Sequence, residues 1–141
     1  MRLTKTGSRI IDIKNQDLHQ TPWLKLTYEV DYNVCVNAGP IKEALNQLDQ
    51  QIINHTAMIL DFTPEEMQEM YRPLLRNCNF YCPIGSATIL FDRERNFWDK
   101  SQIPSILKVG NWVRFIIKFN KITFKDHQLT VQFEVIQIEL S

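Results

Sequence analysis

Residues 112–125 read Trp-Val-Arg-Phe-Ile-Ile-Lys-Phe-Asn-Lys-Ile-Thr-Phe-Lys, and residues 129–135 read Leu-Thr-Val-Gln-Phe-Glu-Val. Apolar and polar side chains alternate in both stretches, which is the period of a β-strand with one buried face. The connecting residues are Lys-Asp-His-Gln, without an apolar side chain. The two stretches therefore predict a β-hairpin. A one-residue slip of the alternation near Val135 and Ile136 predicts a β-bulge there.

The first arm of this hairpin mixes cations with aromatic rings. If Val113, Phe115, Ile117 and Phe119 face the core, the other face points outward. The outward row is then Trp112, Arg114, Lys118, Lys121 and Lys125. Single-stranded nucleic acid needs cations for its phosphates and rings for its bases, so this row is a candidate binding surface. A half-buried hairpin with a solvated face has the same pattern, and surface lysines also protect strand edges from aggregation. Both interpretations stay open.

A second mixed segment, Arg-Glu-Arg-Asn-Phe-Trp-Asp-Lys, covers residues 93–100 inside a polar stretch that we expect to be a loop from 92 to 105. Phe97 and Trp98 have no periodic reason to be buried here. They form either a stacking platform for a base or a hydrophobic plug beneath the loop. The candidate nucleic-acid-binding set therefore also includes Arg93, Arg95, Trp98 and Lys100.

The strongest strand signal outside the hairpin covers residues 23–36. Seven successive alternate positions there, from Leu24 to Val36, are apolar, so we expect one long strand that bends or bulges midway. Shorter strands are expected at residues 8–14, 77–82 and 86–92, with residues 83–85 as a turn between the last two.

Two helices are expected between these early and late strands. Apolar residues at helical spacing predict a helix from Pro40 to about His55. Thr63-Pro64-Glu65-Glu66 has the pattern of a capping box, which predicts the start of a second helix. Pro73 should end or kink that helix, because proline cannot donate an intrahelical hydrogen bond.

Charge is unevenly distributed along the 141 residues, although the formal net charge is zero. Residues 29–71 contain one Lys and eight acidic residues, whereas residues 72–125 contain ten Lys or Arg and three acidic residues. This segregation suggests two faces of opposite sign. Ordinary solvated charge on whichever faces are exposed is the alternative.

The same composition bounds the compartment and the chemistry. No apolar run approaches the ~20 residues of a membrane-spanning helix, and the first residues do not read as a signal peptide. Three cysteines, an odd number, favour a reducing intracellular compartment. The C-x₃-C spacing of Cys78 and Cys82 and three scattered histidines do not match a zinc site. Phosphate-loop, nucleophile-elbow and metalloprotease motifs do not occur, so we expect no enzyme, no cofactor and no metal.

Residues 45–140 carry a series of short motifs whose order and spacing resemble those of a known group of proteins. The matching positions are Leu48-Asp49, Glu66–Leu74 with Tyr71-Arg72-Pro73-Leu74 at its end, Phe91-Asp92, Leu107–Gly110, Val113, Phe115, Ile117, Ile122–Phe124 and Phe133–Ile138. The group is that of the small OB-type single-stranded-DNA-binding proteins of large DNA viruses and related mobile elements. This chain departs from the group at the hairpin turn, which contains no glycine. The resemblance implies DNA binding without sequence specificity during viral DNA replication or recombination.

We therefore predict one α+β domain spanning residues 1–141, an OB-like, partly closed antiparallel β-barrel of about five or six strands with two helices between the early and late strands. An open antiparallel sheet packed on two helices is the alternative architecture. The predicted function is non-enzymatic binding of single-stranded DNA, with RNA as an open alternative and a second copy or a replication protein as a further partner. A host nucleus or cytoplasm is the expected location, and no membrane is involved. The competing hypothesis is a viral structural or assembly protein that acts through protein–protein contacts.

Overall fold

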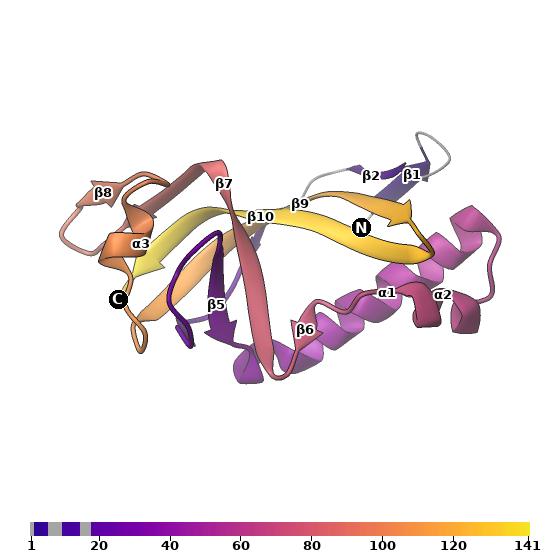
Figure 1. Cartoon of the computed structure of the whole chain (residues 1–141), viewed down its shortest axis with the longest axis horizontal. Coiled ribbons are helices and arrows are strands. Elements are labelled where there is room, and N and C mark those ends of the chain that lie inside the picture. The colour runs from indigo at the N-terminus through magenta and orange to yellow at the C-terminus, as the bar shows by residue number, and fades with distance from the viewer. Residues whose placement is uncertain (1, 6–9, 15–17) are drawn as a thin grey trace.

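The computed structural model, described for residues 2–5, 10–14 and 18–141, contains a ten-stranded sheet with helices along it (Figure 1). The strands are β1 (Arg2–Lys5), β2 (Ile10–Lys14), β3 (Leu18–Gln20), β4 (Leu24–Lys25), β5 (Asn33–Asn37), β6 (Leu75–Arg76), β7 (Asn79–Phe91), β8 (Phe97–Trp98), β9 (Trp112–Lys125) and β10 (Gln128–Leu140). The helices are the 3-10 turn η1 (Gly39–Ile41), α1 (Lys42–Leu60), α2 (Pro64–Met70) and α3 (Ile103–Ile106).

The predicted hairpin is confirmed as the longest pairing of the sheet. β9 and β10 pair antiparallel from Lys125 and Gln128 at the turn to Val113 and Leu140 at the open end. The predicted bulge is confirmed by a register shift between Val135 and Gln137. The odd-numbered residues from Val113 to Phe119 are buried, as predicted.

The hairpin turn needs no glycine because two other residues adopt the left-handed conformation. Asp126 and His127 have φ of 53° and 58°. A two-residue loop with positive φ at both positions matches the twist of the strands that it joins. Asp and His tolerate this conformation better than most residues.

The strands form a ring that is only partly closed. β4 pairs with β9, β9 with β10, β10 with β7, and β7 with β5. A single bridge between Leu26 and Val36 then joins the end of β4 to β5, in place of a continuous pairing. Of these strand pairings only β7 with β10 is parallel. The predicted OB-like α+β fold with two helices between early and late strands is confirmed, with a sheet that does not close into a complete barrel and with one parallel pairing in the otherwise antiparallel ring.

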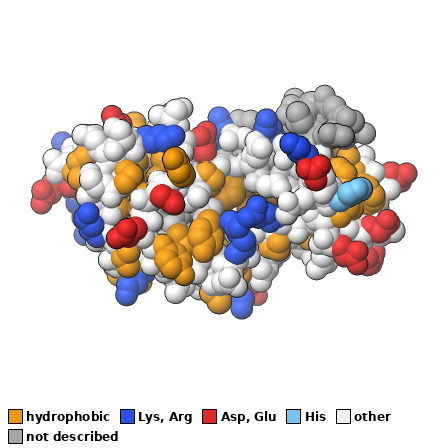
Figure 2. Space-filling view, viewed as in Figure 1, with side chains coloured by type: hydrophobic (Ala, Val, Ile, Leu, Met, Phe, Trp, Pro, Cys, Tyr) orange, Lys and Arg blue, Asp and Glu red, His pale blue; other side chains and the backbone are white. Residues whose placement is uncertain are grey.

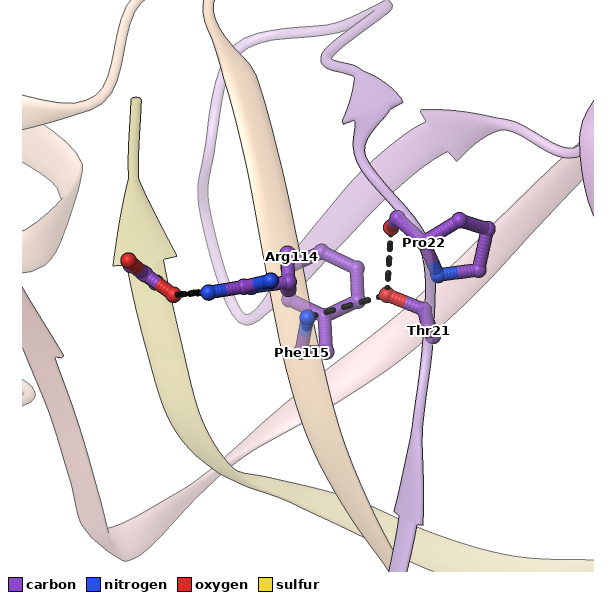
Figure 3. Close-up of polar contacts among 5 residues, drawn as sticks. Thr21, Pro22, Arg114 and Phe115 are labelled. Atoms are coloured by element: carbon purple, nitrogen blue, oxygen red, sulfur yellow. Dashed lines mark hydrogen bonds and ion pairs between the residues drawn. The ribbon is translucent and has the colours of Figure 1, made fainter.

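The first barrel strand is interrupted between β3 and β4 by Thr21 and Pro22 (Figure 3). The Thr21 amide donates to the Phe115 carbonyl (2.9 Å), and the Phe115 amide donates to Thr21 Oγ1 (2.9 Å). The hydroxyl in turn donates to the Pro22 carbonyl at 2.9 Å. The threonine side chain thus satisfies an amide on β9 where the chain bends, so β3 and β4 together act as one strand beside β9.

The single long strand predicted for residues 23–36 is wrong. The chain turns back on itself after Leu26, and the Thr27 amide donates to the Cys35 carbonyl at 3.0 Å. The Asp31 side chain accepts from the Asn33 amide at 2.9 Å and helps to form the turn. The alternation was misleading because both arms bury their apolar side in the same core. The tyrosine at position 32 continues the apolar row in sequence but is 82% exposed at the turn.

The two strands predicted at 77–82 and 86–92 are instead one strand, β7. Its first half pairs with β5, and its second half pairs with β10. Gly85 lies where the strand passes from one partner to the other, and a Cβ there would meet Glu134 Oε2 at 1.8 Å. The Gly85 amide donates to Thr88 Oγ1 (2.8 Å), whose hydroxyl donates to the Val135 carbonyl. The predicted turn is therefore a bend inside a continuous strand.

Both predicted helices are present, and α1 continues to Leu60, about one turn beyond its expected end. The capping box of α2 is confirmed by reciprocal bonds of 3.1 Å between Thr63 and Glu66. The strand expected at residues 8–14 corresponds to β2, and its first two residues lie outside the described residues. Within the described residues, no helix is both long and apolar enough to span a membrane.

Candidate nucleic-acid interface

Two sides of the barrel carry basic and aromatic side chains. We call the outward side of β5, β6 and β7 the β7 wall, and the outward side of β9 the β9 wall. In the ring, β10 lies between β9 and β7, and β4 lies between β9 and β5. The two walls therefore face different directions.

The β7 wall contains a groove of about 170 Å³ beside β6. Its lining includes Arg72, Arg76 and Tyr81, together with Asn33 from the start of β5 and Thr130 from β10. The Arg76 guanidinium carbon lies 4.8 Å from the centre of the Tyr81 ring, which is cation–π distance. Among the described side chains, neither arginine has a carboxylate within 4.0 Å. Figure 2 shows Lys/Arg side chains near the centre of this face, in the region where Figure 1 places β6.

A second hollow of about 470 Å³ includes residues of the turn before β5. It is lined by Asp31, Tyr32, Ser86, Asp99, Lys100, Ser101 and Pro104. Tyr32 offers an open ring, and Lys100 supplies a cation beside the carboxylates of Asp31 and Asp99. The Asp99 carboxylate accepts from the Ser101 hydroxyl (2.6 Å), which is the main reason that its pKa is lowered. The turn at residues 31–33 contributes to both hollows, with Asn33 in the first and Asp31 and Tyr32 in the second.

The β9 wall has its positive charge partly neutralised by the adjacent strand. Arg114 Nε donates to Glu139 Oε2 on β10 at 2.8 Å, and Nη2 of the same arginine donates to the same oxygen (Figure 3). The Arg114 guanidinium also lies 4.7 Å from the Trp23 ring centre, and that of Arg93 lies 5.8 Å from it. Lys118 is the register partner of Glu134. Of the four cations of β9, Arg114 and Lys118 are thus paired in register with acidic residues on β10, whereas Lys121 and Lys125 are paired with glutamines.

The residues predicted at 93–100 separate in the structure. Arg93 and Arg95 are exposed in the turn between β7 and β8, which Asp92 holds by accepting from the Asn96 side chain and amide at 3.0 Å each. These bonds lower the pKa of Asp92. Trp98 packs against the core, whereas Phe97 is 67% exposed. The plug interpretation thus fits Trp98, and Phe97 is the ring that remains open to a ligand.

The nine predicted residues do not form one surface. Lys100 lies on the β7 wall, whereas the hairpin residues lie on β9, with Trp112 half-exposed and Lys125 at the exposed tip. Lys118 and Lys121 are half-buried.

Sequence reasoning missed the central residues of the β7 wall. Arg72 and Arg76 belong to the basic segment 72–125, so a signal for them existed. Tyr32 was hidden in an apolar alternation, and Tyr81 lies in a stretch that we interpreted only as a strand.

Among the described side chains, no three His, Cys, Asp or Glu residues lie close enough together to hold a metal ion. Cys78 is exposed and Cys82 is buried, so the C-x₃-C pair does not converge on one point. Burial raises the pKa of the Cys82 thiol.

No protein-family model matches the chain, and a search of curated proteins finds no match. The fold is similar to that of solved single-stranded DNA-binding protein structures from bacteriophage Enc34. The complex of that protein with ssDNA matches with a TM-score of 0.59 and 10% identity, over 99% of this chain and 93% of the other. A C-terminal truncation matches with the same score and coverage at 13% identity. The fold predicted from the resemblance is thus confirmed, and an origin in large DNA viruses or mobile elements stays a prediction.

Proposed function

We propose that this protein binds single-stranded DNA without sequence specificity, with the β7 wall as its principal interface. The observation that supports this most is the groove in which Arg72, Arg76 and Tyr81 lie together without a carboxylate partner among the described side chains. In OB folds, oligonucleotides bind on the second and third barrel strands and on the loops beside them. Here these strands are β5 and β7, with β3 and β4 counted as the first.

Each group on this wall has a defined role in the proposal. Arg72, Arg76 and Lys100 neutralise phosphates, which supplies a salt-dependent affinity common to all sequences. Tyr81 and Tyr32 stack on bases, which is tolerant of sequence because every base has a π face. Neither phosphate contacts nor base stacking depends on the donor and acceptor pattern of a base, so these contacts favour binding without base specificity.

The residues predicted from sequence remain part of the proposal as a second contact zone. Arg93 and Arg95 lie in the turn between β7 and β8, and the exposed Phe97 follows in β8. Because the guanidinium groups of Arg93 and Arg114 lie over the same Trp23 ring, we assign this zone to the side of the barrel that carries β9. We assign the β9 row from Trp112 to Lys125 a weaker role, because Arg114 is already bound to Glu139.

The similarity in fold to a phage protein whose structure was solved with ssDNA supports this proposal. We further propose that the protein acts without enzymatic activity in viral DNA replication or recombination. A second copy of this chain or a replication protein would be its further partner.

A fluorescence titration with a labelled oligonucleotide tests the proposal. We expect saturable binding to a mixed-sequence single strand, with an affinity that falls linearly in log–log form as salt is raised. Double-stranded DNA and RNA of the same sequence are the matched competitors. No binding at low salt, or binding that ignores salt, contradicts the proposal. A stable oligomer that ignores nucleic acid in the same experiment supports the alternative of a structural or assembly protein.

A further inference from the structure

A buried carboxylate on α1 binds the segment that carries Arg72 and leads into β6, which carries Arg76. Asp49 is 8% exposed, and its Oδ1 accepts from the Tyr71 hydroxyl and from the Leu74 amide, the latter at 3.2 Å. Tyr71 and Leu74 are themselves buried. One carboxylate oxygen therefore fixes both ends of residues 71–74, which lie between α2 and β6.

The segment is also held by the core packing of Tyr71 and Leu74 and by contacts with β10. The Arg72 amide donates to the Leu129 carbonyl at 3.0 Å, and Tyr71 forms an isolated parallel bridge with Leu129 on β10. Arg72 thus lies between the two residues that Asp49 binds, and Arg76 follows in β6, where it pairs with Asn79 of β7. The position of Arg72 therefore depends directly on where residues 71–74 are held, and that of Arg76 depends on the same segment through β6, which begins at Leu75 and is also paired with β7.

A carboxylate at position 49 is unfavourable for packing alone, because its burial removes it from water. Desolvation is the largest influence on this carboxyl and raises its pKa, although the bonds from Tyr71 and Leu74 act in the opposite direction. Burial and the adjacent Asp49 likewise raise the pKa of Tyr71, so the phenol stays a hydrogen-bond donor. An apolar residue would avoid this cost but could not accept either bond.

We propose that Asp49 and Tyr71 are positioning residues of the DNA-binding groove, which hold Arg72 and Arg76 at the spacing that the phosphates require. The inference rests on the proposed function. Asp49 does not line the groove, so it acts through the segment that it binds. Loss of its carboxylate makes residues 71–74 more mobile. The two arginines then lose more conformational entropy when they bind a DNA strand, which weakens binding.

A double-mutant cycle separates positioning from simple destabilisation. The four proteins are the wild type, Asp49→Ala, Arg72→Ala/Arg76→Ala and the triple variant, compared by oligonucleotide titration over a range of salt. We expect Asp49→Ala to weaken binding at 0.1 M salt by up to the ~25-fold expected for loss of two phosphate contacts. In the background without the arginines, the same substitution should change affinity less than about two-fold, because nothing remains to be positioned.

Two further variants keep the test decisive. Asp49→Asn retains a carbonyl acceptor and should restore most of the affinity. Tyr71→Phe keeps the buried ring and removes only the hydroxyl, so it replaces Asp49→Ala in the cycle if that variant does not fold. Equal losses in both backgrounds, or no loss in the wild-type background, overturn the positioning role alone. No loss on removing the arginines themselves overturns the β7 wall as the interface, and the positioning role with it.

Discussion

Removal of the two arginines of the β7 wall should weaken DNA binding more than removal of two lysines of the β9 wall. The test compares Arg72→Ala/Arg76→Ala with Lys118→Ala/Lys121→Ala. Both variants lose two positive charges, so the change in net charge is the same. They differ in surroundings, because Arg72 and Arg76 line the groove beside Tyr81, whereas Lys118 and Lys121 are half-buried on β9, where Lys118 pairs in register with Glu134.

The expected size follows from the release of counterions. Each phosphate contact on a single strand contributes about 0.7 to the slope of log affinity against log salt, so two lost contacts lower the slope by about 1.4. If the loss is purely electrostatic, it vanishes near 1 M salt and amounts to about 25-fold at 0.1 M. We expect the lysine variant to lose less than half of this slope.

The assay is a titration of a labelled oligonucleotide at five or more salt concentrations, with circular dichroism to confirm that each variant is folded. The slope of log affinity against log salt is the informative quantity. A general loss of stability would lower the affinity, but it would not lower this slope by the amount expected for two lost phosphate contacts. Equal slopes for the two variants, or a larger change for the lysine variant, would refute our assignment of the β7 wall as the principal interface.

Three other predictions concern single residues. Tyr81→Ala should weaken binding by about 1–3 kcal/mol at all salt concentrations, as expected for a lost base stack, whereas Trp98→Ala should lower thermal stability more than affinity. Gly85→Ala should lower the unfolding free energy by about 1 kcal/mol in urea titrations, and Glu134→Ala should abolish that effect by removing the clashing carboxylate. Burial raises the pKa of Asp49 in the folded protein, so the folded state binds a proton at this carboxyl more readily than the unfolded state. The free energy of unfolding of the wild type, measured relative to Asp49→Asn, should therefore rise as the pH falls from neutral through the raised pKa towards the ordinary value of 3.8. A pH-independent difference would contradict this last expectation.

The part of the fold that the sequence predicts best is the part that is governed by local pattern. The β9–β10 hairpin, its bulge near Val135 and the capping box at Thr63 all follow from alternation or from fixed spacing. In each case a residue and its partner are close in sequence or related by a simple register. The physical cause is therefore contained in the stretch that shows the pattern.

The errors in the fold come from contacts between distant segments. Residues 24–36 alternate like one strand, but the core accepts both arms of a turn, and alternation alone does not distinguish these two outcomes. Pro83 and Gly85 look like a turn, yet β7 continues through both, and at Gly85 the carboxylate of Glu134 from β10 occupies the space of a Cβ. The sequence around residue 85 contains no sign of that neighbour.

The candidate site shows the same limit for charge. Ten of the sixteen Lys and Arg residues lie in residues 72–125, which suggested one basic face. Strand pairing changes that reading, because the antiparallel partner of β9 belongs to the acidic end of the chain, and Arg114 is bound to Glu139 there. A run of cations on a central strand therefore predicts a binding surface only if the neighbouring strands do not carry the opposite charge at the same positions.

Arg72 and Arg76 escape this neutralisation because of where their segment lies. They follow the acidic helices along the chain. The buried acidic residue of that stretch, Asp49, accepts hydrogen bonds from the Tyr71 hydroxyl and the Leu74 amide, and not from a guanidinium group. An acidic residue is thereby used to fix a basic segment without cancelling its charge. The segregation of charge in the sequence and the groove in the structure are connected through this one carboxylate, and for that reason a substitution far from the surface should change the salt dependence of DNA binding.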